Sequence, residues 1–320
     1  IRWNKERQNL TNLNIDVNFT NQRLASLTEV VRTSLAKKNT TDKDQNVFYW
    51  SEGSISLGRI GDTSISSTKK IGTNGLTFGA DKFTENNGIK GFALRLGNDD
   101  VDVGSSNLNT DTFNLTYYST SQIDNDTKLL DTVFGYGRLN SDISTVLDGN
   151  IINADRPGDQ LYGAFKLKDE IKKGNLTLIP SGQFDFGHTI LNAYKENGTG
   201  AIEVEDQHIQ TKKLRAAMAI VQDLSKEDYT FKRHGKLEYL ADIDRSSNFK
   251  YTYVGDGSPK FNDTLHTGAF HNLNGEIGLD IVFPEHYSIF IIYERKHAFS
   301  NGYNDNLYIA LGYLPYRDTE

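Results

Sequence analysis

The chain has 320 residues, a formal net charge of −7 at pH 7, and no cysteine. Its charges are dispersed without a basic stripe, which argues against a nucleic-acid partner. No stretch approaches the roughly 18–20 apolar residues that a membrane-spanning helix needs. The absence of cysteine suits a chain that crosses an oxidising periplasm. The chain opens on Ile1 without a signal peptide, so we expect a fragment of a longer secreted precursor.

Residues 1 to about 40 contain no glycine or proline and predict a helix. One apolar stripe steps alternately by three and four residues, like a short coiled-coil seam with one polar position. Its members are Leu10, Leu13, Val17, Thr20, Leu24, Leu27 and Val31. The opposite, hydrated face includes Arg23, Ser26, Glu29 and Arg32. The polar segment 39–44 ends the helix, so residues 1–45 are expected to form a helical linker or plug.

From Asn46 onward, short segments of alternating apolar and polar residues predict about twelve β-strands. The gaps between them alternate between long and short, as expected of a barrel assembled from one side of a membrane. Residues 46–320 therefore predict an all-β transmembrane barrel of twelve antiparallel strands, with the long gaps outside the cell. The strands are expected at 46–58, 71–82, 88–99, 110–120, 128–138, 158–170, 175–188, 207–222, 229–245, 264–283, 287–297 and 306–316.

The alternation assigns one face of each strand to lipid and the other to the lumen. A charge on the lipid face near the membrane midplane would cost about 2–4 kcal/mol, so charged positions should face inward. The lipid-facing set is Leu76, Phe78, Phe92, Leu94, Ile277, Leu279, Ile309 and Leu311. The lumen-lining set is Arg95, Lys166, Lys168, Lys213, Arg215, Lys236, Glu238, Glu276, Asp280 and Glu294.

Aromatic residues gather at the strand ends that adjoin the short gaps. Tyrosine and tryptophan favour the membrane interface, where the ring is buried and the polar atom is wet. This clustering predicts an aromatic girdle at one rim, formed by Trp50, Phe83, Tyr118, Tyr287 and Tyr313.

Motifs of catalysis and metal binding are absent from the sequence. No histidine has a glutamate-containing zinc-protease spacing, and there is no Gly-x-Ser-x-Gly elbow, phosphate-binding loop or cysteine nucleophile. The acidic segment 98–102 suggests Ca²⁺, but its spacing matches no calcium loop, which favours a solvated acidic loop. We therefore expect no enzymatic activity, no cofactor and no metal.

Three segments resemble the C-terminal translocator (β-barrel) domain of monomeric autotransporters, the type V secretion proteins. The resemblance covers about residues 46–316. Gly75–Asp81 is similar to an early family strand that ends in Gly-x-Asp, and Leu130–Arg138 is similar to the fifth strand. Leu178–Pro180, followed by Ala193–Gly198, resembles a strand and its Tyr-x-Glu-x-Gly continuation.

The resemblance implies a Gram-negative outer-membrane translocator and anchor that exports an upstream passenger. Implied partners are that passenger, outer-membrane lipid and lipopolysaccharide, the barrel-assembly machinery and periplasmic chaperones, with the chain a monomer. Some family members cut themselves at an Asn-Asn pair on the helix, but the only such pair here is Asn86-Asn87. Self-cleavage by that route is therefore not expected. The chain also continues past Tyr313, where the family usually ends on an aromatic residue.

Two placements of the helix, and two other functions, remain open. As a plug, the helix would bring Arg23, Ser26, Glu29 and Arg32 near Arg95, Arg215, Glu276 and Asp280. As a coiled coil, it would pair with copies of itself. A barrel of about twelve strands encloses roughly one helix, which favours the plug. The other functions are a self-standing porin-like solute channel and a soluble all-β binding protein.

Overall fold

The computed structural model describes residues 47–60, 69–84, 88–124, 127–226, 229–244, 246–255, 259–266, 269–283, 287–299 and 302–313. The helix predicted for residues 1–40 lies outside the described residues, as does the linker that follows it. Within the described part of the chain, no helix is long and apolar enough to cross a membrane.

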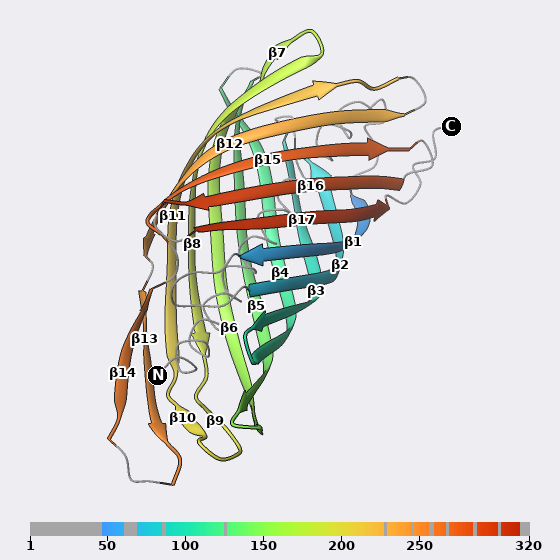
Figure 1. Cartoon of the computed structure of the whole chain (residues 1–320). Coiled ribbons are helices and arrows are strands. Elements are labelled where there is room, and N and C mark those ends of the chain that lie inside the picture. Colours follow the sequence, from blue (N-terminus) through green and yellow to red (C-terminus); the bar gives the residue numbers. More distant parts are fainter. Residues whose placement is uncertain are drawn as a thin grey trace.

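One large antiparallel sheet closes on itself to form a barrel (Figure 1). It contains thirteen strands, of which β7 pairs with β8 alone, and the other twelve form the closed wall. Closure is made by β1 and β17, whose pairing runs from Ser51–Tyr313 to Ile60–Asn304. The predicted barrel of twelve antiparallel strands is confirmed. The wall consists of β1 (Phe48–Ile60), β2 (Lys69–Phe83), β3 (Ile89–Val103), β4 (Ser106–Asp124), β5 (Lys128–Leu147), β6 (Asn150–Asp169), β8 (Leu176–Leu191), β11 (Gln207–Asp223), β12 (Thr230–Asp244), β15 (His271–Val282), β16 (Tyr287–Ala298) and β17 (Gly302–Tyr313).

Two smaller features project from opposite ends of the barrel (Figure 1). At one end, β7 (Ile171–Lys173) and the start of β8 form a hairpin. At the other end, a second sheet has the strand order β14-β13-β10-β9. Its strands come from the two longest connections, and their bounds are β9 (Tyr194–Lys195), β10 (Ile202–Val204), β13 (Ser246–Tyr253) and β14 (Phe261–His266). We call this second sheet the outer sheet.

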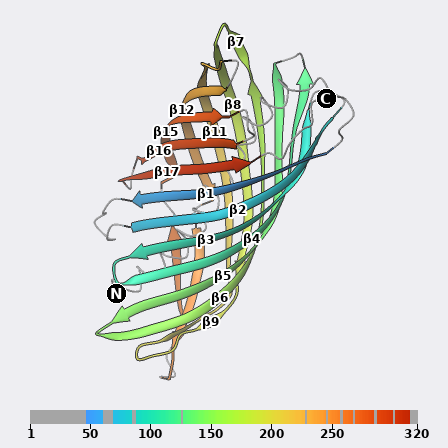
Figure 2. The ribbon, with the colours of Figure 1, turned by 90° about the vertical axis from the view of Figure 1, so that its right-hand side faces the viewer.

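The strands of the wall differ in length, which corrects part of the predicted gap pattern. β15, β16 and β17 have 12 residues each, whereas β5 and β6 have 20. A membrane strand needs about 9–11 residues, so β3 to β6, which lie side by side in Figure 2 and have 15 to 20 residues, continue past that length. Their connections are tight turns at 104–105 and 148–149, with φ values of 59° and 79° at the two glycines. The long gaps predicted at 100–109 and 139–157 are therefore wrong, because these polar stretches are strand.

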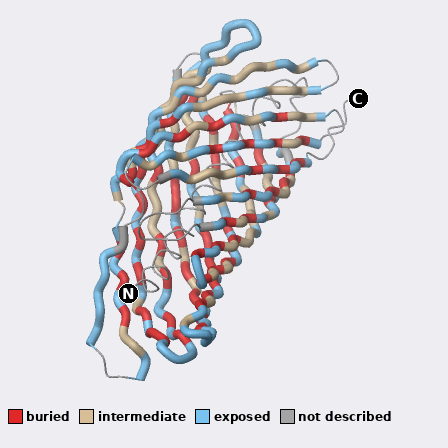
Figure 3. Tube along the Cα trace, in the orientation of Figure 1, coloured by how far each residue is buried: buried red, intermediate tan, exposed pale blue. Residues whose placement is uncertain are grey.

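The extended strands alternate as regularly as the rest of the wall (Figure 3). On β3, Val101 and Val103 are fully buried. The alternate positions, Asp100 and Asp102, are on the opposite face of β3. Asn107 of β4 donates hydrogen bonds to both of them, at 2.8 and 2.9 Å. The segment 98–102 is thus part of β3 rather than the solvated acidic loop that was predicted.

An apolar core joins the extended strands to the outer sheet. Side chains from both partners form one buried cluster: Ile71, Val101, Val103, Leu108, Ile143, Ala154, Tyr194, Ile202, Val204, Phe249 and Tyr251. We call this cluster the outer core. It is held at one edge by Arg156 of β6, which is 2% exposed. Its guanidinium donates to the Asn192 carbonyl at 2.9 Å and to Gln207 Oε1 at 3.1 Å, and Gln207 donates to Ser247 of β13.

Candidate functional site

The inner surface of the barrel carries charged and polar side chains, and the outer surface carries apolar ones. The eight positions predicted to face lipid range from half-buried Leu94 to Ile277, which is 63% exposed. The ten charged positions predicted to line the lumen are all buried or half-buried. In a barrel this small, inward-facing side chains fill or line the interior. The interior is therefore the candidate site.

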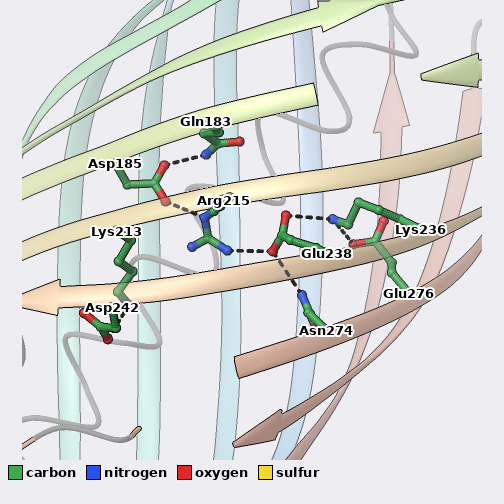
Figure 4. A network of polar contacts seen from close by, with 9 residues as sticks. All are labelled: Gln183, Asp185, Lys213, Arg215, Lys236, Glu238, Asp242, Asn274 and Glu276. Atoms are coloured by element: carbon green, nitrogen blue, oxygen red, sulfur yellow. Dashed lines mark hydrogen bonds and ion pairs between the residues drawn. The ribbon is translucent and has the colours of Figure 1, made fainter. Parts of the chain in front are cut away.

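The centre of the charged interior is Arg215 on β11, which lies between two carboxylates from its neighbouring strands (Figure 4). Its Nε is 2.5 Å from Asp185 Oδ2 on β8, and its Nη1 is 2.8 Å from Glu238 Oε1 on β12. All three side chains are less than 10% exposed. Charge-assisted hydrogen bonds of this kind are short and about twice as strong as neutral ones. Arg215 thus fixes three strands in register from inside.

Further polar groups extend this network along both directions of the wall (Figure 4). Lys236 Nζ lies 2.7 Å from Glu276 Oε2 and 3.8 Å from Glu238 Oε2. Gln183 donates to Asp185 at 2.5 Å, and Asn274 donates to Glu238 at 3.4 Å. The chain of contacts therefore runs without interruption from β8 to β15.

Further contacts between polar side chains adjoin the central network. Lys213 lies 3.9 Å from Asp242, and Lys168 lies 2.9 Å from Asp131 of β5. His234 approaches Asp280 at 3.3 Å and Glu276 at 3.6 Å. Breaking one partner of a buried pair would leave an uncompensated charge, at a cost of about 3–5 kcal/mol. The structure thus brings most of the predicted charged set into mutual contact.

The remaining three predicted residues have different neighbours. Lys166 has no carboxylate within ion-pair distance among the described residues. Glu294 of β16 stands opposite Glu276 of β15 in the strand register. Arg95 of β3 donates instead to two hydroxyls, Ser54 at 3.0 Å and Thr77 at 3.1 Å.

The ion pairs described above join residues of β5, β6, β8, β11, β12 and β15. The inner positions of β1 to β4 combine hydroxyl groups, such as those of Ser56 and Thr73, with the charged side chains Glu52, Asp81 and Arg95.

Sequence reasoning missed several members of the network. Asp185 and Asp131 each complete an ion pair, and His234 lies between two carboxylates. The alternation offered a signal for all three, because each has the same parity as an inward-facing residue of its own strand. What the sequence did not contain was the cross-strand register that decides which charge meets which.

Two of the predicted girdle residues face the interior, so that prediction is wrong for them. Trp50 and Tyr118 are 6% and 4% exposed. The Trp50 Nε1 donates to the Tyr118 hydroxyl at 2.9 Å, and both donate to Asp81. Their parity places them inward, and Gly79 opposite Trp50 leaves the space for the indole, since a Cβ there would lie 2.0 Å from it.

The other girdle residues lie elsewhere. Tyr287 and Tyr313 are 56% and 40% exposed, and their ring centroids are 5.1 Å apart on neighbouring strands. Phe83 ends β2, but its side chain lies outside the described part. Among the predicted girdle residues whose side chains the structure describes, this tyrosine pair presents rings on the outer surface as the prediction requires.

Comparison with known proteins gives one family match and several structural neighbours. The model of the autotransporter beta-domain family matches residues 49–294. The translocator domain of autotransporter NalP from Neisseria meningitidis superimposes with a TM-score of 0.64 and 16% identity, covering 92% of this chain and 97% of that one. The beta domain of the Bordetella autotransporter BrkA gives 0.60 and 11%, covering 85% and 100%.

A different kind of transporter is also similar. The toluene transporter TbuX of Ralstonia pickettii matches with a TM-score of 0.51 and 7% identity, covering 84% of this chain and 89% of that one. At such identities these likenesses concern the fold alone. No curated protein sequence matches the chain.

Proposed function

The chain belongs to the autotransporter beta-domain family, and on that premise we propose that this outer-membrane barrel exports an upstream passenger to the cell surface and then anchors it. The outer sheet would lie on the cell surface, and the hairpin of β7 in the periplasm. The placement follows the rule that bacterial barrels keep short turns in the periplasm and longer segments outside. The membrane would be the outer membrane of a Gram-negative bacterium.

The observation that carries this proposal is the charged interior of the barrel. Arg215, Lys236 and their carboxylate partners line a continuous polar surface from β8 to β15. A hydrated polypeptide can pass such a surface without losing its own polar contacts, because water-mediated hydrogen bonds are nearly as favourable as direct ones. An apolar interior would not allow this.

We also propose that the helix predicted for residues 1–40 occupies the lumen after export. Its polar residues Arg23, Ser26, Glu29 and Arg32 would meet the inner wall, where Arg95, Arg215, Glu276 and Asp280 are buried or half-buried. Each hydrated pair contributes only about 0–1 kcal/mol. The plug would be held by many weak contacts and could be displaced.

The outer surface of the barrel supports a proposal about the lipids and proteins that the barrel would contact. Its apolar positions, among them Leu76, Phe92 and Ile309, would contact lipid and lipopolysaccharide. Assembly would need periplasmic chaperones and the barrel-assembly machinery, and the barrel would act as a monomer without a cofactor.

Planar-bilayer recordings test the plug. The pore of the full chain should be nearly closed, and a variant without residues 1–40 should conduct ions. A second variant, in which a glycine-serine linker of equal length replaces residues 1–40, should conduct ions as well. Equal conductance in all three proteins would place the helix outside the pore and would favour the porin-like channel.

Export itself is tested with a reporter joined ahead of Ile1. Intact cells should display the reporter to added protease, and a barrel that fails to assemble should leave it in the periplasm. A reporter that stays protected while the barrel is assembled and heat-modifiable on gels would contradict the export proposal.

A further inference from the structure

Two histidines meet on the outer surface of the barrel, away from the charged interior. His188 belongs to β8 and His208 to β11, two neighbouring strands of the wall (Figure 1). In the strand register His188 stands opposite Gln210, and His208 stands opposite Ile190, so the two imidazoles are diagonal neighbours. His208 is exposed and His188 is half-buried.

The two rings present nitrogen atoms to each other. His208 Nδ1 lies 3.5 Å from His188 Nε2, and the ring centroids are 5.5 Å apart with an interplanar angle of 33°. This separation is at the outer limit of a hydrogen bond, so a direct N–H···N contact would be weak. The rings are nevertheless aimed at each other rather than away into solvent.

The same separation suits a metal ion between the rings. Zinc binds imidazole nitrogen at about 2.0–2.1 Å, and an ion at that distance from both nitrogens would give an N–metal–N angle of about 117°. That angle lies close to the tetrahedral angle that zinc prefers. Imidazole also suits Cu²⁺ and Ni²⁺. The distance between the two nitrogens thus matches the separation of two ligands on one ion.

The remaining ligands of a metal ion at this place would come from solvent. Within the described residues, no group of three or more His, Cys, Asp or Glu side chains is placed to hold a metal ion. Next to the pair, Gln210 accepts a hydrogen bond from Lys212 at 3.2 Å. The protein would thus supply two nitrogen ligands, one fewer than the three of an open zinc site, and water would complete the coordination.

We propose that His188 and His208 form a two-ligand transition-metal site, occupied by Zn²⁺, that links β8 to β11 on the outer surface. The two strands are consecutive in the wall but are separated along the chain by the connection that carries β9 and β10. A metal bridge would therefore clamp the base of that connection. No metal was expected from the sequence, since two histidines 20 residues apart on different strands match no spacing motif.

Metal binding to the purified full chain in detergent tests the site. Calorimetric titration with ZnCl₂ at pH 7.5 should show one site, and His188→Asn and His208→Asn should each weaken it about 10–100-fold or more, since even losing the partner behind a ligand costs that much. His297→Asn changes a histidine on the outer surface of β16 and should bind as the parent does.

Further measurements test whether both histidines bind the same ion. Cu²⁺ bound to the parent should show two coupled nitrogens in its electron paramagnetic resonance spectrum, and each single variant should show one. Gel mobility with and without heating confirms that each variant is a folded barrel. Absence of zinc binding in the parent, or binding unchanged in both single variants, would overturn the site.

Discussion

The barrel wall and its extension toward the outer sheet are made from the same strands, yet they have opposite polarity. On β3, the inner face carries Arg95 within the barrel and fully buried Val101 and Val103 in the extension. The outer face changes in the reverse sense, from Phe92 and Leu96 to Asp100 and Asp102. The parity of the strand never changes along this course.

What changes is the environment that each face meets. Within the barrel, the outer face would meet lipid and the inner face a polar interior, whereas beyond the rim the inner face packs against the outer sheet. Apolar side chains therefore occupy the face that is shielded from water, which we call the dry side. This face is the outer one within the barrel and the inner one in the extension. A single strand can thus carry a membrane pattern and a soluble-protein pattern in succession.

The largest expected effect concerns the dry side of the extension. Phe249 of β13 is 2% exposed in the outer core, and Phe249→Ala should cost about 3–5 kcal/mol through lost burial and the cavity left behind. The loss should be confined to the outer sheet, measured as faster proteolysis of β13 and β14 while the barrel keeps its heat-modifiable mobility. Phe261→Ala, at a position 36% exposed on the same sheet, is the control and should be milder. Equal sensitivity would mean that the outer core does not hold the sheet.

The next effect concerns the dry side of the barrel. Leu94→Arg places a charge on the outer face of β3 and should cost about 2–4 kcal/mol or block assembly. Asp100→Arg, on the same face of the same strand beyond the rim, should cost only about 0.5–1.5 kcal/mol, through the lost hydrogen bond from Asn107. Arg95→Leu, on the inner face, should also be much milder for folding than Leu94→Arg. Denaturant titration in lipid vesicles measures all three, and a reversed ranking would mean that the parity of β3 is wrong.

Inside the barrel, one added methyl group should be enough to disturb the packing of an aromatic ring. Gly135 stands opposite Tyr162, and a Cβ at Gly135 would lie 2.1 Å from the tyrosine ring. Gly135→Ala should therefore force the ring aside and cost about 1–3 kcal/mol. Gly53→Ala adds the same methyl group to β1, where no atom lies within 4 Å, and should be neutral in the same denaturant titration. A neutral Gly135→Ala would show that Tyr162 can move without loss.

The smallest effect lies on the exposed side of the outer sheet. Lys260 Nζ is 2.6 Å from Glu205, and this hydrogen bond with its positive charge lowers the pKa of the Glu205 carboxyl below its ordinary value of 4.5. The pair also raises the pKa of Lys260 above 10.5. Its contribution is therefore complete at neutral pH, is lost as pH falls through the lowered value, and is lost again as pH rises through the raised one. Because the pair is exposed, Glu205→Gln should alter the acid dependence of proteolysis near β10 only slightly. A large change would indicate that the pair is less solvated than its exposure implies.

Much of the fold was visible in the sequence, because alternation depends only on neighbours along one strand. The alternation predicted the strands of the barrel, and it predicted that residues such as Arg215 and Glu238 have inward parity. It failed at 100–109 and 139–157, where polar residues on a water-facing strand were read as loop. Trp50 and Tyr118 were misplaced because their residue type was weighed above their parity. The pairing of Arg215 with Asp185 requires a register between strands 30 residues apart, which no local pattern contains.

The pairing of charges inside the barrel would have a kinetic consequence for the export that we propose. At Arg215, a passing carboxylate would meet a guanidinium that already binds Asp185 and Glu238, and these two negative charges offset its attraction to the cation. The net gain at such a paired position would be small. Residence there would be short, and friction would depend on water exchange more than on the sequence of the cargo.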